Sequence, residues 1–125
     1  MKFMCLVYND DALLDSMSDA EFWAFSDAHV MVDEELKRSG HSLAAEALQP
    51  SRSAKTVRVR SGKLHVTDGP FAEAKEQVGG IYMIEAADMA EAIEIAARIP
   101  SAQVTGIEVR PIWELRQHEP RLGRT

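Results

Sequence analysis

Two short segments that are apolar on both faces constrain the fold of this chain more than any other feature of its sequence. They are residues 2–8, KFMCLVY, and residues 78–86, VGGIYMIEA. A strand with one face in water alternates apolar and polar residues, whereas a strand covered on both faces does not. We therefore predict two strands that lie inside a sheet, with material packed against each side of it.

A long amphipathic helix is predicted between these two strands, over residues 18–39. Ser18 and Glu21 have the spacing of a capping box, and Gly40 supplies a stop at the C-terminal end. The apolar stripe of this helix recurs at three- and four-residue steps and consists of Phe22, Phe25, His29, Val32 and Leu36. The stripe indicates that one face of the helix packs against the sheet.

Four more strands and a second helix account for the rest of the chain. The helix is predicted over 87–99, with Asp88 as its cap and Pro100 after its end. The strands are residues 43–48, 55–60, 64–67 and 106–115. A turn signal at 61–62 joins the middle two into a hairpin. The order indicates an α+β fold of the ferredoxin-like βαββαβ type with an inserted β-hairpin.

The predicted sheet has one face more than its helices can cover. Two helices lie on the same side of such a sheet, yet the strands at 2–8 and 78–86 carry apolar residues on both sides. A second copy of the chain is the simplest cover for the remaining face. We therefore expect a homodimer.

The composition limits the classes of protein to which the chain can belong. Its 125 residues suit one domain, which we place at 1–115, followed by a basic tail at 116–125. The net charge of −6 argues against a nucleic-acid partner. The chain has no run of about 20 apolar residues, and its opening run is too short for a signal peptide, so no membrane is expected. A single cysteine, Cys5, forms no internal disulfide and is typical of the cytoplasm.

The most distinctive pattern in the chain is DGPFAEAKEQVGG at residues 68–80. This segment resembles the signature of the YCII-related family, whose members are also called DGPF-domain proteins. Shorter stretches agree with it: EALQP at 46–50, KTVRVRSGK at 55–63 and EVRPI at 108–112. The resemblance implies a dimeric α/β barrel with a pocket between sheet and helix, near the motif loop. It also implies acid–base chemistry by a histidine and an aspartate, which here would be His29 and Asp68.

His29 is the strongest candidate for chemistry on the residues alone. It lies in the apolar stripe of the first helix, so its side chain is expected to face the sheet, where its N–H needs a partner. Asp33, one helical turn away, or Asp68, from the motif loop, could supply that partner. A histidine oriented by a carboxylate can act as a general base near neutral pH. The alternative is a hydrogen-bonded histidine of the core.

Four further side chains are candidates for ligand binding. Phe71 would form a wall of the pocket or of the dimer interface, and Glu73 and Lys75 would contact a partner chain or a ligand or else lie in solvent. Glu46 is a third acid–base candidate, or an exposed residue at the edge of the sheet. Two glycines at 79–80, which open a strand, indicate a bulge or a close approach of backbones.

Two functions from different classes follow from these residues. The first is an isomerase- or lyase-type enzyme for a small molecule, with His29 as acid or base and Asp68 as its orienting group. The second is a dimer without catalytic activity that binds a small ligand or a regulatory partner. No metal or cofactor is expected, because His41 and His65 lie far apart and no clustered Cys/His pattern exists.

Overall fold

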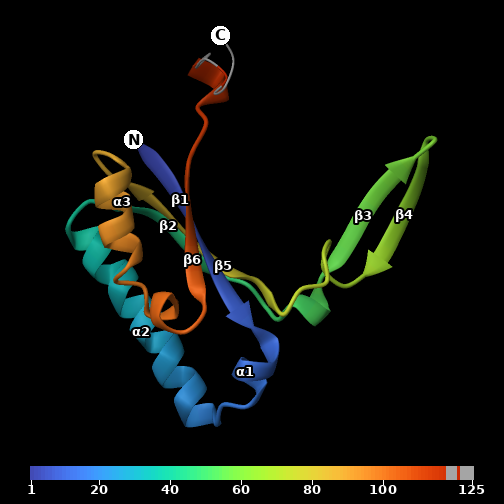
Figure 1. The fold of residues 1–125 in the computed structure, drawn as a ribbon, viewed down its shortest axis with the longest axis horizontal. Helices are drawn as coiled ribbons and strands as arrows, with labels where there is room; N and C mark the ends of the chain where they lie inside the picture. Colours follow the sequence, from blue (N-terminus) through green and yellow to red (C-terminus); the bar gives the residue numbers. More distant parts are fainter. Residues whose placement is uncertain (118–120, 122–125) are drawn as a thin grey trace.

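The computed structural model describes residues 1–117 and 121, and it shows an α+β fold built on a four-stranded antiparallel sheet (Figure 1). The strands lie in the order β2-β5-β1-β6, which is consistent with a ferredoxin-like arrangement. The strands are β1 Lys2–Asp10, β2 Ser42–Ala47, β3 Lys55–Arg60, β4 Lys63–Asp68, β5 Glu76–Glu85 and β6 Gly106–Pro111. The α-helices are α1 Asp11–Asp15, α2 Asp19–Arg38 and α3 Met89–Ala96. Three short 3-10 helices are η1 Ser51–Ser53, η2 Pro100–Gln103 and η3 Leu115–Gln117.

The predicted boundaries of α2 are confirmed, and its capping explains them. The Ser18 hydroxyl accepts a hydrogen bond from the Glu21 backbone N–H at 3.1 Å, and the Glu21 carboxylate accepts one from the Ser18 N–H at 3.0 Å. This reciprocal pair satisfies two of the free donors at the start of the helix. Gly40 follows the end of the helix with φ of +81°, a conformation that favours glycine.

Several predicted boundaries were wrong, each at an element's end. The second helix stops at Ala96 instead of residue 99, and the chain then enters η2 at Pro100. The last strand ends at Pro111 instead of residue 115, because its partner β1 begins at Lys2, whose carbonyl accepts a last hydrogen bond from the Ile112 N–H at 2.9 Å. The short helix α1 was not predicted; five residues are too few to show a hydrophobic period. The predicted basic tail begins inside η3, and most of it lies outside the described residues.

The core lies between the sheet and the two longer helices. Alternate residues of β1 and β5 face these helices and are buried, among them Phe3, Cys5 and Ile84, none of which is exposed. Leu36 from α2 and Ile99, just after α3, close the core from the other side. The alternation of burial along β1 and β5 means that one chain covers only one face of its own strands.

The second face of the sheet is open and largely apolar. Neighbouring strands place the Met4 and Leu6 side chains of β1 level with Met83 and Ile81 of β5, and all four are only partly buried. Tyr8 lies on the same face, where its hydroxyl donates to a Glu108 carboxylate oxygen at 3.2 Å. We call this the open face.

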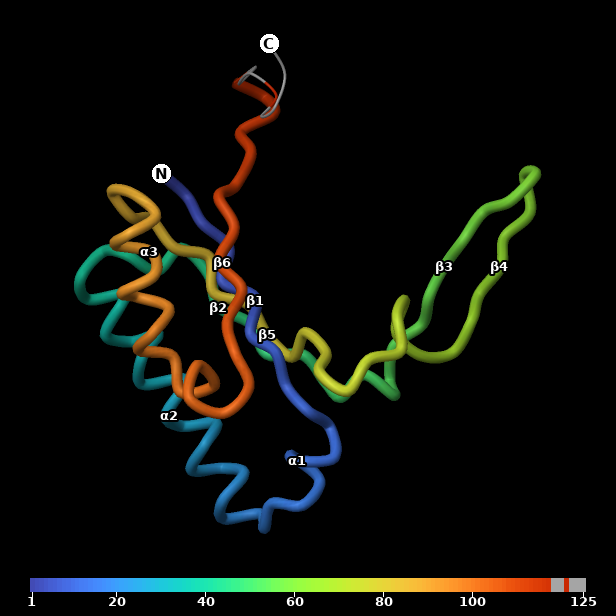
Figure 2. Tube along the Cα trace, viewed as in Figure 1, coloured from blue at the N-terminus to red at the C-terminus, as the bar shows by residue number. Residues whose placement is uncertain are grey.

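The hairpin β3–β4 forms a sheet of its own that stands away from the rest of the molecule (Figure 2). It leaves at the end of the sheet where β2 ends and β5 begins, on the side opposite α2 and α3 (Figure 1). We call residues 55–68 the arm and the remaining described residues the body. The predicted hairpin is confirmed, with Val57 opposite Val66 and Arg58 opposite His65.

Candidate functional site

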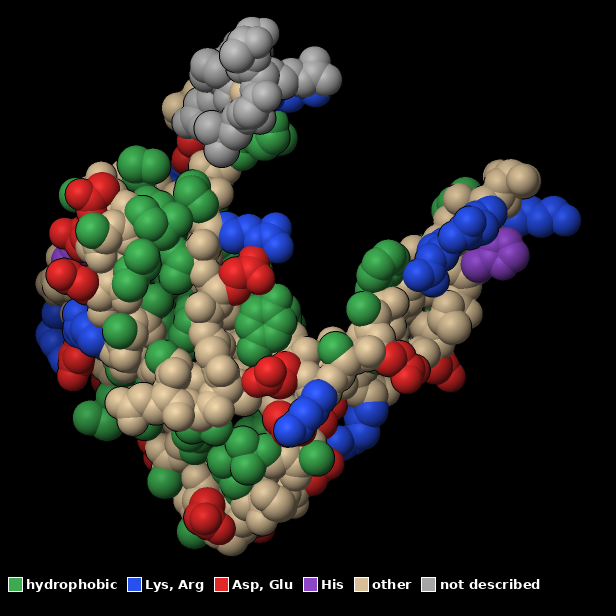
Figure 3. Space-filling view, viewed as in Figure 1, with side chains coloured by type: hydrophobic (Ala, Val, Ile, Leu, Met, Phe, Trp, Pro, Cys, Tyr) green, Lys and Arg blue, Asp and Glu red, His purple; other side chains and the backbone are tan. Residues whose placement is uncertain are grey.

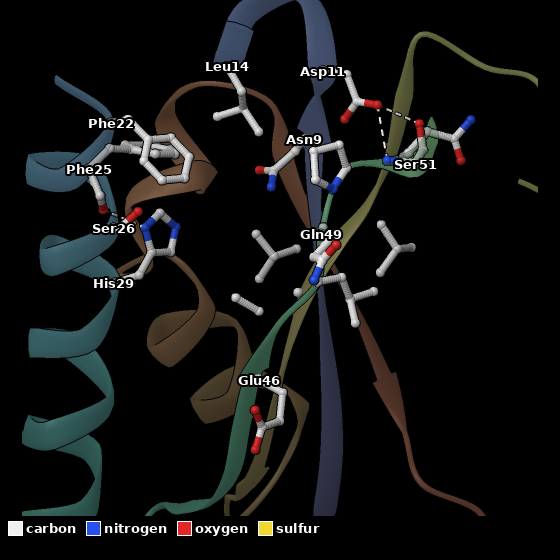
Figure 4. A pocket seen from close by; sticks show the side chains of 18 of the residues that line it. Asn9, Asp11, Leu14, Phe22, Phe25, Ser26, His29, Glu46, Gln49 and Ser51 are labelled. Carbon is white, nitrogen blue, oxygen red and sulfur yellow. Dashed lines mark hydrogen bonds between the residues drawn. The ribbon is translucent and has the colours of Figure 1, made fainter. Parts of the chain in front are cut away.

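A pocket of about 760 Å³ lies between α2 and the sheet, at the end where β2 and β5 meet the chain leading to the arm (Figure 4). Its walls come from α1, α2, β1, β2, β5 and the segment after β2. The volume is within the range of sites that hold small organic ligands. The pocket is therefore the candidate functional site among the described residues.

One wall of the pocket is aromatic and aliphatic. Phe22 and Phe25 project from α2 towards the sheet, and Leu14 of α1 lies above them (Figure 4). Val7 and Ala45 supply apolar surface from the sheet. These side chains face the sheet because they belong to the apolar stripe of α2 or to the inward positions of the strands. This wall can hold an apolar or aromatic part of a ligand.

The opposite end of the pocket is polar. Asn9, Gln49 and Gln77 line it, and Figure 4 shows Asn9 across the pocket from the two phenylalanines. Asp11 accepts hydrogen bonds from the Ser51 backbone N–H at 3.1 Å and from its hydroxyl at 2.5 Å. These bonds tie α1 to the segment after β2, so the rim on this side is held in place.

A β-bulge positions Asn9 at the pocket. The pairing of β1 with β5 shifts between Val7 and Tyr8, which leaves Gly79 as the extra residue. A Cβ atom at Gly79 would lie 2.0 Å from the Asn9 Nδ2 atom, so only glycine leaves room for this amide. The sequence predicted a bulge or close approach at residues 79–80, and both are present. Asn9 itself was not predicted, because it meets Gly79 only when β1 pairs with β5, and the two residues lie far apart in the sequence.

His29 lines the pocket, but both of its ring nitrogens are engaged. Nδ1 lies 2.9 Å from the Phe25 carbonyl oxygen, which can only accept, so Nδ1 carries the proton. Nε2 lies 2.8 Å from the Ser101 hydroxyl and therefore accepts its hydrogen bond. Burial lowers the pKa of His29 more than the hydrogen bond to Phe25 raises it, so the neutral ring is favoured. The prediction that Asp33 or Asp68 is its partner is wrong within one chain.

Ser101, which bonds to His29, is a second residue that was not predicted from the sequence. Its side chain is fully buried in η2, and it is 72 residues from His29 in the chain. The bond therefore connects α2 to the segment between α3 and β6. No local sequence pattern predicts this hydrogen bond, because the residues next to His29 and next to Ser101 in the chain carry no sign that the two meet. Ser101 is not part of the pocket lining.

Asp33 is committed to structural bonds at the side of the pocket. Its carboxylate accepts a hydrogen bond from the Ser42 hydroxyl at 2.6 Å and pairs with the Lys37 ammonium at 2.9 Å. Burial pushes the pKa of Asp33 upward, but the bonds from Ser42 and Lys37 outweigh it and leave the pKa below its usual value. Asp33 is thus a carboxylate at neutral pH and links α2 to β2.

Asp68 does not meet His29. It is the last residue of β4, its side chain is 86% exposed, and its carboxylate pairs with Lys55 across the hairpin. The hydrogen bond and charge of Lys55 lower the pKa of Asp68. Because the arm stands away from the body, Asp68 lies outside the pocket lining, and the expected placement of Asp68 at the rim is wrong for one chain.

The other predicted ligand-binding residues divide between the pocket and the arm. Glu46 does border the pocket, at the edge strand β2. Phe71 is 77% exposed and lies beneath the Arg58 guanidinium, 4.8 Å from ring centroid to Cζ. Lys75 lies 3.8 Å from the Asp10 carboxylate, and Glu73 is exposed. None of Phe71, Glu73 and Lys75 lines the pocket.

The pocket carries more negative than positive charge. Its acidic lining residues are Asp11, Asp15, Asp19, Asp33 and Glu46, whereas Arg52 is its cationic one. Arg52 is itself paired with Asp15 at 3.1 Å. An anionic ligand would therefore meet a repulsive field at this site.

Within residues 1–117 and 121, no group of three or more His, Cys, Asp or Glu side chains is arranged to hold a metal ion. The described helices include none that is both long and apolar enough to cross a membrane.

Comparison with known proteins agrees with this architecture. The model of the YCII-related domain matches residues 1–116. The chain belongs to the YCII-related domain family. An uncharacterized protein of Rhizobium meliloti (strain 1021) is 34% identical over 119 residues, which cover 90% of this chain and 92% of the relative. The resemblance found in the sequence is thereby confirmed for the family. The relative's description adds no activity.

Proposed function

We propose that this YCII-related protein binds a small ligand in the pocket between α2 and the sheet and does so as a homodimer without catalysing a reaction. The observation that carries the proposal is the state of His29. The pocket is present, but the imidazole on its wall has one nitrogen bonded to Phe25 and the other to Ser101. A general base needs a free lone pair within reach of its substrate.

The alternative of His29–Asp68 acid–base catalysis has weaker support. Asp68 is exposed on the arm and paired with Lys55, so within one chain it does not orient His29. A proton could reach His29 Nε2 only if the buried Ser101 hydroxyl gave up its bond. Binding requires neither change.

The lining defines the chemistry of the ligand. An aromatic or aliphatic part would pack against Phe22 and Phe25, and a polar end would face the amides of Asn9, Gln49 and Gln77. The excess of carboxylates favours a neutral or cationic molecule over a carboxylate or phosphate. A small amphipathic amide, alcohol or amine has this combination.

A second copy is proposed to cover the open face, as in a dimeric α/β barrel. Met4, Leu6, Ile81 and Met83 make that face apolar, and contiguous apolar surface of this kind marks interaction sites. The barrel and its cytoplasmic location are parts of this proposal. The buried thiol of Cys5, whose pKa burial raises to about 11, suits a reducing compartment.

A thermal-shift screen with matched variants tests the proposal. Neutral and cationic aromatic compounds should raise the melting temperature of the wild type, because a ligand that binds only the folded state stabilises it. Phe22→Ala should abolish the rise, whereas Trp23→Ala should keep it, since Trp23 is the neighbouring aromatic residue but does not line the pocket. Anionic analogues should give no rise.

Two results would count against the proposal. The first is a library in which no neutral or cationic compound stabilises the wild type. The second is turnover of a bound compound that disappears in His29→Gln while binding remains, which would restore the catalytic alternative.

A further inference from the structure

The arm has two chemically different faces. Cross-strand pairs place four apolar side chains on one face, and each is between 57% and 68% exposed: Val57, Val59, Leu64 and Val66. The other face carries cationic side chains and a histidine: Arg58, Arg60, Lys63 and His65. The basic face is turned towards the viewer in Figure 3. A basic face in solvent is ordinary for a surface hairpin, but a fully exposed apolar face is not.

An apolar hairpin that stands alone is a poor structure in water. Two strands without a packed face are at best marginally stable, and their edges expose unpaired backbone groups. The body contributes nothing to cover the apolar face, since all four of its side chains are exposed in the single chain. Their burial therefore requires another molecule.

The DGPF segment fixes the arm at its root. The Gly69 N–H donates to the Ala54 carbonyl at 2.8 Å, and the Thr56 hydroxyl donates to the Gly69 carbonyl at 2.9 Å. Gly69 has φ of +100°, where a side chain is strained. Arg58 lies over the Phe71 ring, and Lys55 pairs with Asp68. Residues 68–71 of the motif thus tie the root of the arm and do not line the pocket, whereas its last residues, 77–80, do line it.

The direction of the arm leaves a hollow beside the open face. The arm extends on the side of the sheet opposite the helices (Figure 1), and Figure 3 shows the molecule hollowed between arm and body. The open face borders this hollow, and the apolar face of the arm is a second surface that lacks a cover. One partner of domain size could cover both.

The distribution of charge between the arm and the rest of the chain favours a second copy as that partner. The arm holds four cationic and one acidic side chain, a net charge of +3, so the rest of the chain carries −9 out of the total of −6. A basic arm and an acidic body on the same chain are complementary between two copies. A polyanion such as nucleic acid would be attracted by the arm alone and repelled by the body.

We propose that the arm is a dimerisation clasp: the apolar face made by Val57, Val59, Leu64 and Val66 packs against the body of a second copy, and the DGPF segment holds the arm at the angle this requires. The clasp rests on the homodimer proposed above and goes beyond it, because contact between the two open faces does not involve the arm. It also gives the exposed motif a role in assembly in place of catalysis.

Light scattering at a series of concentrations tests the clasp. The wild type should have twice the 13.9 kDa mass of one chain at micromolar concentration. Val57→Thr/Val66→Thr keeps β-branched strand formers and adds only polarity to the apolar face. We expect this variant to raise the dimer dissociation constant at least tenfold. Val104→Thr, at a valine that is also half-exposed but lies outside the arm, should leave the constant unchanged.

Photo-crosslinking locates the contact even if the double variant misfolds. A benzophenone amino acid in place of Leu64 should give a covalent dimer on illumination, with crosslinks mapped to the partner's body. The same probe in place of Trp23, which is 62% exposed on α2, should give none. A wild-type monomer would overturn both the dimer and the clasp.

A dimer with no crosslink from position 64 and an unchanged constant in the double variant would overturn the clasp alone. Binding of the arm to DNA or anionic vesicles without an effect on the dimer would also overturn it. Ligand binding is read separately by the Phe22 and Trp23 variants, so failure of the pocket is distinguishable from failure of the clasp.

Discussion

The body and the arm both contain strands with an apolar face, yet the chain buries such a face only in the body. Phe3 and Ile84 are fully covered by α2 and α3, whereas Val59 and Leu64 in the arm are about two-thirds exposed. The body therefore draws its stability from contacts within the chain. The arm depends on contacts that a second copy would provide. An apolar strand pattern therefore indicates that a face is to be buried, but not whether the same chain or a partner covers it.

The largest expected difference between the two regions is in the free energy of unfolding that is lost when a leucine is replaced by alanine. Leu36→Ala removes a fully buried side chain from the core and should lower the free energy of unfolding by about 2–5 kcal/mol. This loss should not depend on protein concentration. Leu64→Ala in the arm should change the free energy by less than about 0.5 kcal/mol in dilute, monomeric protein.

The concentration dependence of the second variant makes the comparison decisive. Leu64→Ala should become destabilising only as the wild type dimerises, because stability is then linked to association. Urea melts at several protein concentrations measure both variants. An equal loss in both variants in dilute solution would show that the arm is part of the body's cooperative core.

A smaller difference is expected between the two histidines. His29→Leu leaves the buried Ser101 hydroxyl without its acceptor and should lower the free energy of unfolding by about 1–3 kcal/mol. His65→Leu, at an exposed position of the arm, is the matched control and should be close to neutral. The same urea melts measure it, and an unchanged midpoint for His29→Leu would mean that its hydrogen bonds add nothing to the fold.

Backbone strain at the root of the arm should have a smaller effect on stability, and this effect should be confined to the arm. Gly69→Ala places a side chain at a positive φ, which we expect to cost about 1–2 kcal/mol. Hydrogen exchange should show faster opening of the arm's amides, while those of β5 serve as the internal control. Faster exchange in both regions to the same degree would contradict the separation of arm from body.

The smallest expected effect is the pH dependence that His29 gives to the body. Burial lowers its pKa in the folded chain, so below about 6.5 the unfolded chain binds a proton that the folded chain does not. The stability advantage of the wild type over the His29→Leu variant is thus fully present above that pH and is lost as the pH falls. Urea melts at a series of pH values should show the gap between the two proteins narrowing in acid. A gap that widens in acid would contradict a neutral His29.

Elements coded by neighbouring residues were predictable from the sequence. The capping of α2 by Ser18 and Glu21, the hairpin at 55–68 and the bulge at Gly79 all depend on residues close in the chain or on the local needs of the backbone. The doubly apolar β1 and β5 indicated a sheet with two faces to cover. That signal is also local, because it rests on the period of the strand.

What the sequence determined by itself was the set of elements, the position of His29 on the inward stripe of α2 and the likeness of its motif to the YCII-related family. Only the tertiary structure decided which partners these residues have. It paired His29 with Ser101, 72 residues away, and it kept Asp68 on the arm, paired with Lys55. The physical reason is that helices, caps and turns are fixed by nearest neighbours, whereas contacts between distant residues depend on how the elements pack and on the direction in which the arm leaves the body.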